Sequence, residues 1–370
     1  MNAQRLFLPQ LVILLLLVAC NGESLPSTPA LSVPGNPDAP PAFTIFTQNV
    51  YVGTNVDAVL TAPAEELPAA IGQALATFLA TDWPARADAI AARIVSSRAE
   101  AVVLNELTNL TVTGFGGLLP ELEVPFLPVL MQRIAAHGGN YQVAAMVANT
   151  DANLAVGPGT IRLRDFDAVL VRGGVPFELV AEQQFAARAP VNLGALGSFD
   201  LIRGFVAVEV MSASGPVLVV GTHLEPVETS PLLQAAQAQE LLGWLDGRGV
   251  ATVVAGDINS APTDPSPIAP YRQLLAAGFR DSWLERVGPR QDPGFTCCHD
   301  ESLLNQQPTL VKRIDHVLVR SPRPGRGVIS AELFGAEPTD RLPNGLWPAD
   351  HAGILATMTF PGGTSALPVP

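Results

Sequence analysis

The chain has 370 residues, of which 48% are hydrophobic, so it can bury a sizeable core in one large or two small domains. Its formal net charge is −13, from 34 acidic and 21 basic residues, and Lys312 is its only lysine. The absence of a basic run argues against a sequence-independent binder of the nucleic-acid backbone, although an acidic protein can still carry a local basic patch.

The N-terminus has the pattern of a targeting segment. Arg5 precedes an apolar run, Leu11–Ala19, that is too short to span a bilayer but suits the core of a signal peptide. The run ends in Leu-Val-Ala-Cys20, which resembles a bacterial lipoprotein box, where the cysteine becomes the lipidated first residue. An ordinary secretory signal cleaved nearby is the alternative. We therefore expect residues 1–20 to direct export, and residues 21–41, rich in Pro, Ser, Gly and Asn, to form a flexible tether.

The folded domain is expected at residues 42–362, followed by a disordered tail at 363–370. Apolar spacing and start signals predict helices at 63–80, 84–98, 128–137, 232–245, 271–277 and 282–286. Short apolar runs predict strands at 43–50, 101–105, 142–148, 167–172, 205–211, 217–222, 252–255, 315–320, 330–334 and 353–360. The segment 114–128, rich in Gly and Pro, is expected to be a long loop. Many short strands with helices between them indicate an α+β fold with two packed mixed sheets and helices outside.

The stretch Thr252–Ser260 is the most informative part of the sequence. An apolar run predicts a buried strand, and Gly256 lets the backbone pass close to another group. Asp257 and Asn259 then follow at i and i+2, so an extended chain presents them on one side. A carboxylate that can accept a proton beside an amide that can donate to an anionic oxygen suits attack on a phosphate. A strand that ends in an ordinary Asp/Asn turn gives the same pattern when this stretch is considered alone.

Other predicted strands also have polar residues at their ends. Groups of this kind converge when they share one edge of a sheet, where ligand clefts commonly form. The stretches concerned are Thr47-Gln48-Asn49-Val50, Val103-Leu104-Asn105-Glu106, Gly221-Thr222-His223-Leu224, Gly256-Asp257-Ile258-Asn259, Arg313-Ile314-Asp315-His316 and Ala349-Asp350-His351.

These six stretches, in this order, resemble the motifs of the endonuclease/exonuclease/phosphatase family, whose fold is a four-layer α/β sandwich like that of pancreatic deoxyribonuclease. The resemblance spans Ala42 to about Phe360. Two positions depart from the family pattern, since Asn105 stands where Gln is usual and Ala349 stands where Ser is usual. Neither departure removes a catalytic group.

The resemblance implies a metal site. Glu106 would be the principal ligand of Mg²⁺, which prefers a few carboxylates together with water and phosphate, and Mn²⁺ or Ca²⁺ could replace it. Asn49 would hydrogen-bond near the metal or the phosphate, and Asp350 would lie within reach of a metal. The alternatives are a solvated carboxylate for Glu106 and a turn residue for Asn49.

The resemblance also implies the groups that act on the phosphate. Asp257 would orient or deprotonate the attacking water, and Asn259 would stabilise the charged oxygen. His351 would contact the scissile phosphate, and Asp315 would fix its tautomer. His223 would be the second histidine at the phosphate, its alternative being a buried histidine satisfied by the backbone.

The resemblance also implies an acidic partner for His223, and Asp165 takes this place, with Asp167 as its competitor. Arg203 could supply positive charge to a substrate, but we expect it to be a surface arginine. The histidines at 137, 299 and 316 match no role, so a surface or structural place is expected for each.

The resemblance implies a metal-dependent hydrolase of phosphoric esters. The family includes nucleases, sphingomyelinases and inositol-phosphate phosphatases, and the motifs do not choose among them. A lipid anchor on Cys20 and an acidic body favour a phospholipid headgroup, extracellular nucleic acid or a nucleotide as substrate, with the membrane as a partner and no obligate protein partner. A surface binding module that kept the fold and lost turnover is the alternative in a different class.

Cys297 and Cys298 are adjacent and leave three states open. They could be reduced, could bind zinc with His299, or could form a vicinal disulfide. Export makes a disulfide permissible, and lipidation of Cys20 would leave this pair with no other partner. The vicinal disulfide is our hypothesis.

Overall fold

The structure is a computed structural model, and it describes residues 41–117, 121–213, 215–288, 291–321 and 327–360. The expected signal peptide with Cys20, the tether apart from Pro41, and the tail at 363–370 lie outside these residues. None of the helices in the described residues is long and apolar enough to cross a bilayer.

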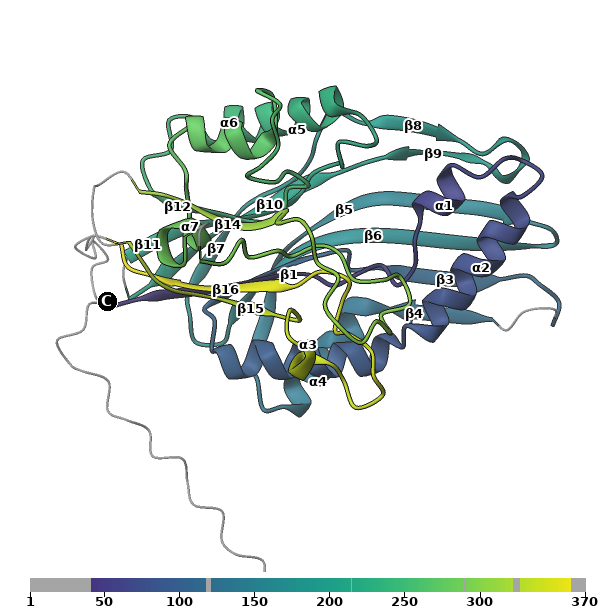
Figure 1. Cartoon of the computed structure of the whole chain (residues 1–370), viewed down its shortest axis with the longest axis horizontal. Coiled ribbons are helices and arrows are strands. Elements are labelled where there is room, and N and C mark those ends of the chain that lie inside the picture. The colour runs from purple at the N-terminus through teal and green to yellow at the C-terminus, as the bar shows by residue number, and fades with distance from the viewer. Residues whose placement is uncertain (1–40, 118–120, 214, 289–290, 322–326, 361–370) are drawn as a thin grey trace, which may run out of the picture. The chain divides into compact units, whose positions relative to one another are not determined.

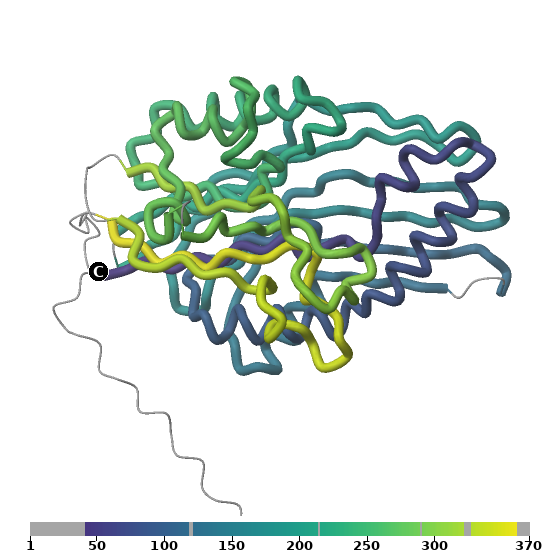
Figure 2. The backbone as a smooth tube through the Cα atoms, in the orientation of Figure 1, coloured from purple at the N-terminus to yellow at the C-terminus, as the bar shows by residue number. Residues whose placement is uncertain are grey.

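Two mixed β-sheets form the centre of the domain (Figure 1). The first has eight strands, in the order β15-β16-β1-β2-β6-β3-β4, with β5 paired to β6. Its strands are β1 (Phe43–Asn49), β2 (Ala101–Asn105), β3 (Asn109–Thr113), β4 (Leu122–Pro125), β5 (Tyr141–Val156), β6 (Gly159–Arg172), β15 (Val328–Phe334) and β16 (Gly353–Met358). The first and last strands of the domain, β1 and β16, run side by side as antiparallel neighbours (Figure 2).

The second sheet has six strands, in the order β13-β14-β12-β11-β10-β7. They are β7 (Phe177–Gln184), β10 (Gly204–Ser212), β11 (Gly215–His223), β12 (Ala251–Asp257), β13 (Arg280–Asp281) and β14 (Asp315–Arg320). A separate two-stranded ribbon consists of β8 (Ala189–Asn192) and β9 (Ser198–Leu201), joined by the short 3-10 helix η1 (Gly194–Leu196).

The two sheets pack face to face through small branched side chains. Val103 and Val169 of the first sheet belong to one buried cluster with Val206, Val219 and Val253 of the second. Short β-branched residues fit this position because both sheets can approach closely over a pleated surface. The strands β2 and β12 are therefore buried on both faces, which explains their continuous apolar runs.

Helices cover the outer faces and complete four layers (Figure 1). The first sheet is covered by α2 (Leu67–Ala80), α3 (Trp83–Ser97) and α4 (Phe126–Ala136), and the second by α5 (Pro231–Leu245) and α6 (Pro270–Ala276). The short elements α1 (Asp57–Leu60), α7 (Ser282–Arg286) and η2 (Pro338–Asp340) lie in connections. In α3, Asp82 caps the first turn by accepting from the Ala85 amide, while Ile90 and Ile94, one turn apart, are fully buried.

The sequence predicted this architecture, and the structure shows it: an α+β sandwich with two mixed sheets between helices. The prediction of a loop at 114–128 was wrong, because this segment contains β4 and the start of α4. The strands predicted at 142–148 and 167–172 belong to a much longer hairpin, formed by β5 and β6, and are the halves of these strands that lie away from its turn.

Two parallel strand pairs bring the polar strand ends together. β1 runs parallel to β2 in the first sheet, and β11 runs parallel to β12 in the second. Gly256, near the end of β12, has φ +129°, and a Cβ at this position would overlap the Thr222 carbonyl oxygen. This close approach of two backbones requires glycine, as the sequence suggested.

Candidate active site

Asn49, Glu106 and Asp257 meet where β1, β2 and β12 end. The side-chain nitrogen of Asn49, Nδ2, donates to Glu106 Oε1 at 3.0 Å and to Asp257 Oδ2 at 3.2 Å, so this side chain joins the two sheets. Glu106 Oε2 accepts from the Val52 amide at 2.6 Å, and Asp257 Oδ1 accepts from the Asn259 amide at 2.8 Å. These contacts hold two carboxylates in fixed positions on either side of one carboxamide.

His351 stands beside Asp257 and is held by Asp315. Its Nδ1 lies 2.7 Å from Asp315 Oδ2 and 3.8 Å from Asp257 Oδ2. The Gln48 side chain also donates to the His351 carbonyl oxygen at 2.8 Å, which ties this residue to the end of β1. The pairing of Asp315 with His351 that the sequence predicted is thus made in the structure.

The surroundings of Asp257 and His351 raise the pKa values of both. Burial, with repulsion from Asp315, raises the pKa of Asp257 to about 8. Burial would lower the pKa of His351, but Asp315 and Asp350 raise it well above its ordinary value. The raised pKa favours the imidazolium form of His351, which lies beside a carboxyl group that can take up a proton.

The donor set fits a hard divalent cation. Asp350 Oδ1 and Asp315 Oδ1 are buried and have no hydrogen-bond partner within the described part of the chain. Burial, with Glu106 adding to it, raises the pKa of Asp350 to about 7 against the opposing effect of His351. Oxygen ligands that repel one another in this way are relieved by a bound cation. The ligand atoms of Asp257, Asp315 and His351 also lie within 4.8 Å of one another, so this group could hold a metal as well.

His223 and Asn259 complete the site from the second sheet. The side-chain nitrogen of Asn259, Nδ2, donates to the Leu224 carbonyl oxygen at 2.9 Å and lies 3.2 Å from His223 Nε2. His223 Nε2 is also 3.6 Å from Asp257 Oδ2. Both side chains therefore lie next to the position where a phosphate could bridge Asp257 and the metal ligands.

Arg203, just before β10, lies between the two groups that the sequence paired. Its Nη1 donates to Asp165 Oδ2 at 3.2 Å and lies 3.0 Å from His223 Nδ1, while its Nε donates to Glu225 Oε1 at 2.8 Å. The expected pairing of Asp165 with His223 is thus replaced by a guanidinium that contacts both. The expectation of a surface arginine was wrong, since the Arg203 side chain is only 16% exposed. The competitor Asp167 instead accepts from Asn105 at 2.9 Å.

This arrangement sets the tautomer of His223. A guanidinium has donors only, so the contact with Arg203 requires His223 Nδ1 to accept, and the ring proton is left on Nε2. There it points to Asp257 Oδ2 at 3.6 Å, and the Asn259 NH₂ group, which is also a donor, is a neighbour and not a hydrogen-bond partner. Burial and the Arg203 charge hold the pKa of His223 well below its ordinary value. The ring is therefore neutral and presents an N–H beside Asp257.

Replacing Arg203 with Gln is expected to raise the pKa of His223, because the nearest positive charge is removed while a hydrogen-bond donor is kept. A histidine NMR titration would measure the shift, and ¹⁵N chemical shifts would report the loss of the single tautomer. Arg188→Gln, which removes an exposed arginine paired with Asp200, should leave His223 unchanged. An unaltered His223 titration in Arg203→Gln would contradict this assignment.

The three remaining histidines have structural or surface places. His316 is buried between the Ser260 carbonyl oxygen and Arg313, and His299 stacks on Trp347 with ring centroids 3.9 Å apart. His137 lies on the surface, with Nε2 3.1 Å from Asp88. The alternative in which His299 and the cysteines bind zinc is not favoured, because the His299 ring faces Gly335 and Asn305.

Cys297 and Cys298 are joined by a disulfide in the structure, which is one of the three states that the sequence left open. Cys297 forms β-bridges with Lys312 and with His351. Cys298 Sγ lies 3.9 Å from His351 Nε2. The cysteine pair therefore lies at the rim of the site.

The sequence missed several residues that shape the site. Glu225 anchors Arg203, and Asn105 accepts from the Asp257 amide at 3.0 Å. Arg86, fully buried in α3, donates to the carbonyl oxygens of Val50 and Pro348, which lie on the segments that carry Asn49 and Asp350. Arg86 lies on the same helix as the half-buried Arg93, and nothing in the sequence indicates that Arg86 is the fully buried one of the two. The roles of the predicted site residues themselves stay predictions.

The chain is similar in structure to several proteins whose structures have been solved. No curated protein matches the sequence. Among solved structures, an endonuclease/exonuclease/phosphatase from Beutenbergia cavernae is 21% identical, with 88% of this chain and 73% of that chain covered and a TM-score of 0.51. A mannosyl-6-phosphatase from Bacteroides thetaiotaomicron is 16% identical, with 86% and 100% covered and a TM-score of 0.52. A humanised TDP2 of D. rerio is 15% identical, with 86% and 99% covered and a TM-score of 0.52.

These similarities establish the fold. The sequence model of the endonuclease/exonuclease/phosphatase family matches residues 47–351, a range that runs from the end of β1 to His351 and includes each of the six motifs. The chain therefore belongs to the endonuclease/exonuclease/phosphatase family.

Proposed function

We propose that this protein is an extracytoplasmic, Mg²⁺-dependent phosphoesterase that hydrolyses a phosphodiester or phosphomonoester by attack of water. Its family acts on phosphoester bonds. The observation that carries the proposal is the contact of Asp257 with both the Asp315–His351 pair and the Asn49–Glu106 pair. A proton acceptor, a cationic ring and oxygen ligands for a metal meet there at the end of two sheets.

Each residue of the site has a role that follows from its charge and its hydrogen-bonding groups. Asp257 holds the attacking water and, in its deprotonated form, accepts a proton from it, since a raised pKa makes the carboxylate a stronger base. His351, kept positive by Asp315, neutralises the phosphate, and the N–H groups of Asn259 and His223 donate to its oxygens. Glu106 and Asn49 would hold Mg²⁺ with Asp350 in reach, and the cation would supply charge neutralisation on a phosphate oxygen.

The location of the enzyme and the source of its substrate are part of the proposal. Export and lipid attachment through Cys20 would hold the domain at the cell envelope, near phospholipid headgroups and extracellular nucleic acid. A non-catalytic binding module is disfavoured because Glu106, Asp257, Asn259, Asp315 and His351 are all present and adjoin one another. Mn²⁺ or Ca²⁺ could take the place of Mg²⁺.

Hydrolysis of bis-p-nitrophenyl phosphate by the purified protein tests this proposal. We expect release of p-nitrophenol that requires Mg²⁺ and stops with EDTA. Glu106→Gln should lose most of this activity because an amide is a poorer ligand for a hard cation, whereas Glu178→Gln, at an exposed position in β7, should keep it. Equal activity of Glu106→Gln and the wild type would remove Glu106 from the metal site, and no hydrolysis by the wild type with any divalent ion would remove the proposed function.

A further inference from the structure

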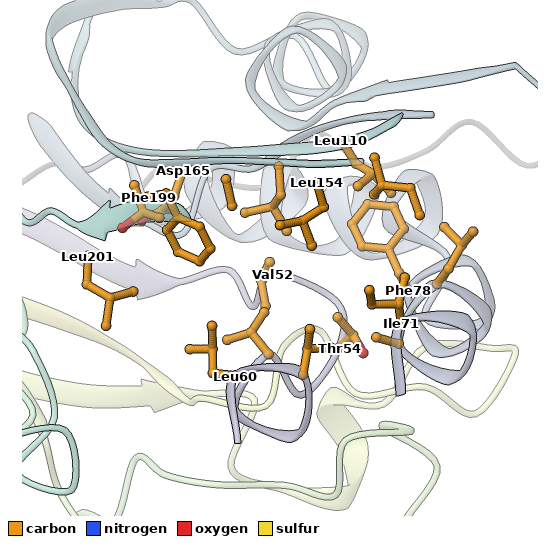
Figure 3. Close-up of a pocket in the computed structure, with 18 of the residues that line it drawn as sticks. Val52, Thr54, Leu60, Ile71, Phe78, Leu110, Leu154, Asp165, Phe199 and Leu201 are labelled. Atoms are coloured by element: carbon orange, nitrogen blue, oxygen red, sulfur yellow. The ribbon is translucent and has the colours of Figure 1, made fainter. Parts of the chain in front are cut away.

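An apolar pocket of about 180 Å³ opens beside the candidate active site. It lies between α1 and α2 on one side and β3, β5 and β6 on the other, and the β8–β9 ribbon closes one end (Figure 3). Its wall is aliphatic and aromatic, with Leu60 and Ile71 facing Leu154, and with Phe78 and Phe199 at its two ends (Figure 3). Side chains in protein interiors normally fill such a space, so a pocket of this size in an apolar wall is an unusual feature of the domain.

The charged part of the pocket wall belongs to the candidate site. Glu106, Asp165 and Arg203 line the pocket, and no other charged residue of the described chain does so. Val52 also connects the two, since its side chain lines the pocket while its amide donates to Glu106 Oε2 at 2.6 Å. A phosphate held next to Glu106 would thus have the apolar wall within reach of one of its ester substituents.

The chemistry of the wall favours a hydrocarbon over a nucleobase. A base needs polar partners for its edge, and leaving them out costs binding energy. Thr54 and Thr150 are the only neutral hydroxyl side chains of the described wall. The Thr150 hydroxyl is already engaged with both the amide and the carbonyl of Ile202. An engineered cavity of about 150 Å³ with a similar wall stays dry and binds benzene, so this pocket suits a short alkyl or acyl segment.

We propose that this pocket binds an alkyl or acyl chain of the substrate, so that the enzyme acts on an amphiphilic phosphoester. This inference rests on the proposed function, because it takes the phosphate site at Glu106 and Asp257 as the position of the reacting group. Each methylene that enters the pocket should improve binding about fourfold.

A series of p-nitrophenyl alkyl phosphate diesters with methyl, butyl and hexyl chains tests the pocket, since the leaving group is the same and only the other substituent grows. With about three methylenes buried, kcat/KM with Mg²⁺ should be about 60-fold higher for the hexyl than for the methyl ester. Ala74→Phe, which fills the pocket from α2, should bring this ratio towards one. Ala76→Phe, two residues along the same helix at an exposed position, is the matched control and should keep the wild-type ratio. Ala152→Leu narrows the opposite wall and replaces Ala74→Phe should that variant not fold.

Calorimetric binding of methyl phosphate and hexyl phosphate, with Mg²⁺ present, separates the pocket from the chemistry. Tighter binding of hexyl phosphate than of methyl phosphate by the wild type and by Ala76→Phe, but not by Ala74→Phe, supports the pocket. If the same wild-type protein hydrolyses no ester, the pocket stands and only the proposed phosphoesterase activity is rejected. Hydrolysis of the methyl ester with no preference for longer chains would overturn the pocket and keep the phosphoesterase. A preference for longer chains that Ala74→Phe and Ala152→Leu leave unchanged would also overturn it.

Discussion

Asp257→Asn is expected to lower turnover of a phosphodiester by ~10²–10⁴, the usual range for a positioned proton-transfer group. The amide has nearly the same shape, so it can keep the contact from the Asn259 backbone, but it cannot accept a proton from water. Steady-state hydrolysis of bis-p-nitrophenyl phosphate at saturating Mg²⁺ measures the loss. Asp246→Asn, at an exposed carboxylate after α5, should behave as the wild type.

A pH–rate profile makes the same prediction more specific. Activity of the wild type should require deprotonated Asp257 and protonated His351, so it should rise on the acidic side and fall on the basic side of an optimum. The raised pKa of His351 places the fall at a pH well above the ordinary histidine value. The rising limb should be lost in Asp257→Asn. A variant that retains wild-type turnover, or one whose residual profile keeps both limbs, would exclude Asp257 as the proton acceptor.

The sequence predicted those parts of the fold whose local pattern agrees with their burial. Strands such as β2 and β12 are apolar at nearly every position because both faces are covered, and α3 carries its apolar residues one turn apart. β7 was missed because four of the eight residues of Phe177–Gln184 are Glu or Gln, and only its pairing with β10 makes it a strand. β3 could have been found, since Asn109–Thr113 alternates buried and half-buried residues with the period of a strand.

The candidate site was predictable where a group sits at the end of a strand that the sequence reveals. Asn49, His223 and Asp257 are residues of this kind, and sheet geometry brings them together. Arg203 was misjudged because its burial depends on Asp165 and Glu225, which are 38 and 22 residues away along the chain. The apolar pocket was not predictable for the same reason, since α2 and the β5–β6 hairpin form its walls only after they pack.

Arg86→Met is expected to lower the free energy of unfolding by about 3 kcal/mol or more. Arg86 is fully buried, and its guanidinium donates to the carbonyl oxygens of Val50, Tyr51, Thr81 and Pro348. Methionine keeps the apolar volume but leaves these buried acceptors without a donor, at about 1–3 kcal/mol for each group that water cannot reach. Urea denaturation, followed by far-UV circular dichroism, measures the change.

Arg93→Met on the same helix is the matched control for this loss. Arg93 is half-buried and pairs at 3.2 Å with the exposed Glu332, so its removal should cost about 1 kcal/mol, less than the loss of the fully buried Arg86. Arg86→Lys should be intermediate, because an ammonium keeps the charge but cannot reach four carbonyls from one nitrogen. Val50 and Pro348 adjoin the segments that carry Asn49 and Asp350, so the folded fraction of Arg86→Met should also lose activity, which Arg93→Met should retain. If Arg86→Met and Arg93→Met proved equally stable, the carbonyl cluster around Arg86 would not be what holds these two segments together.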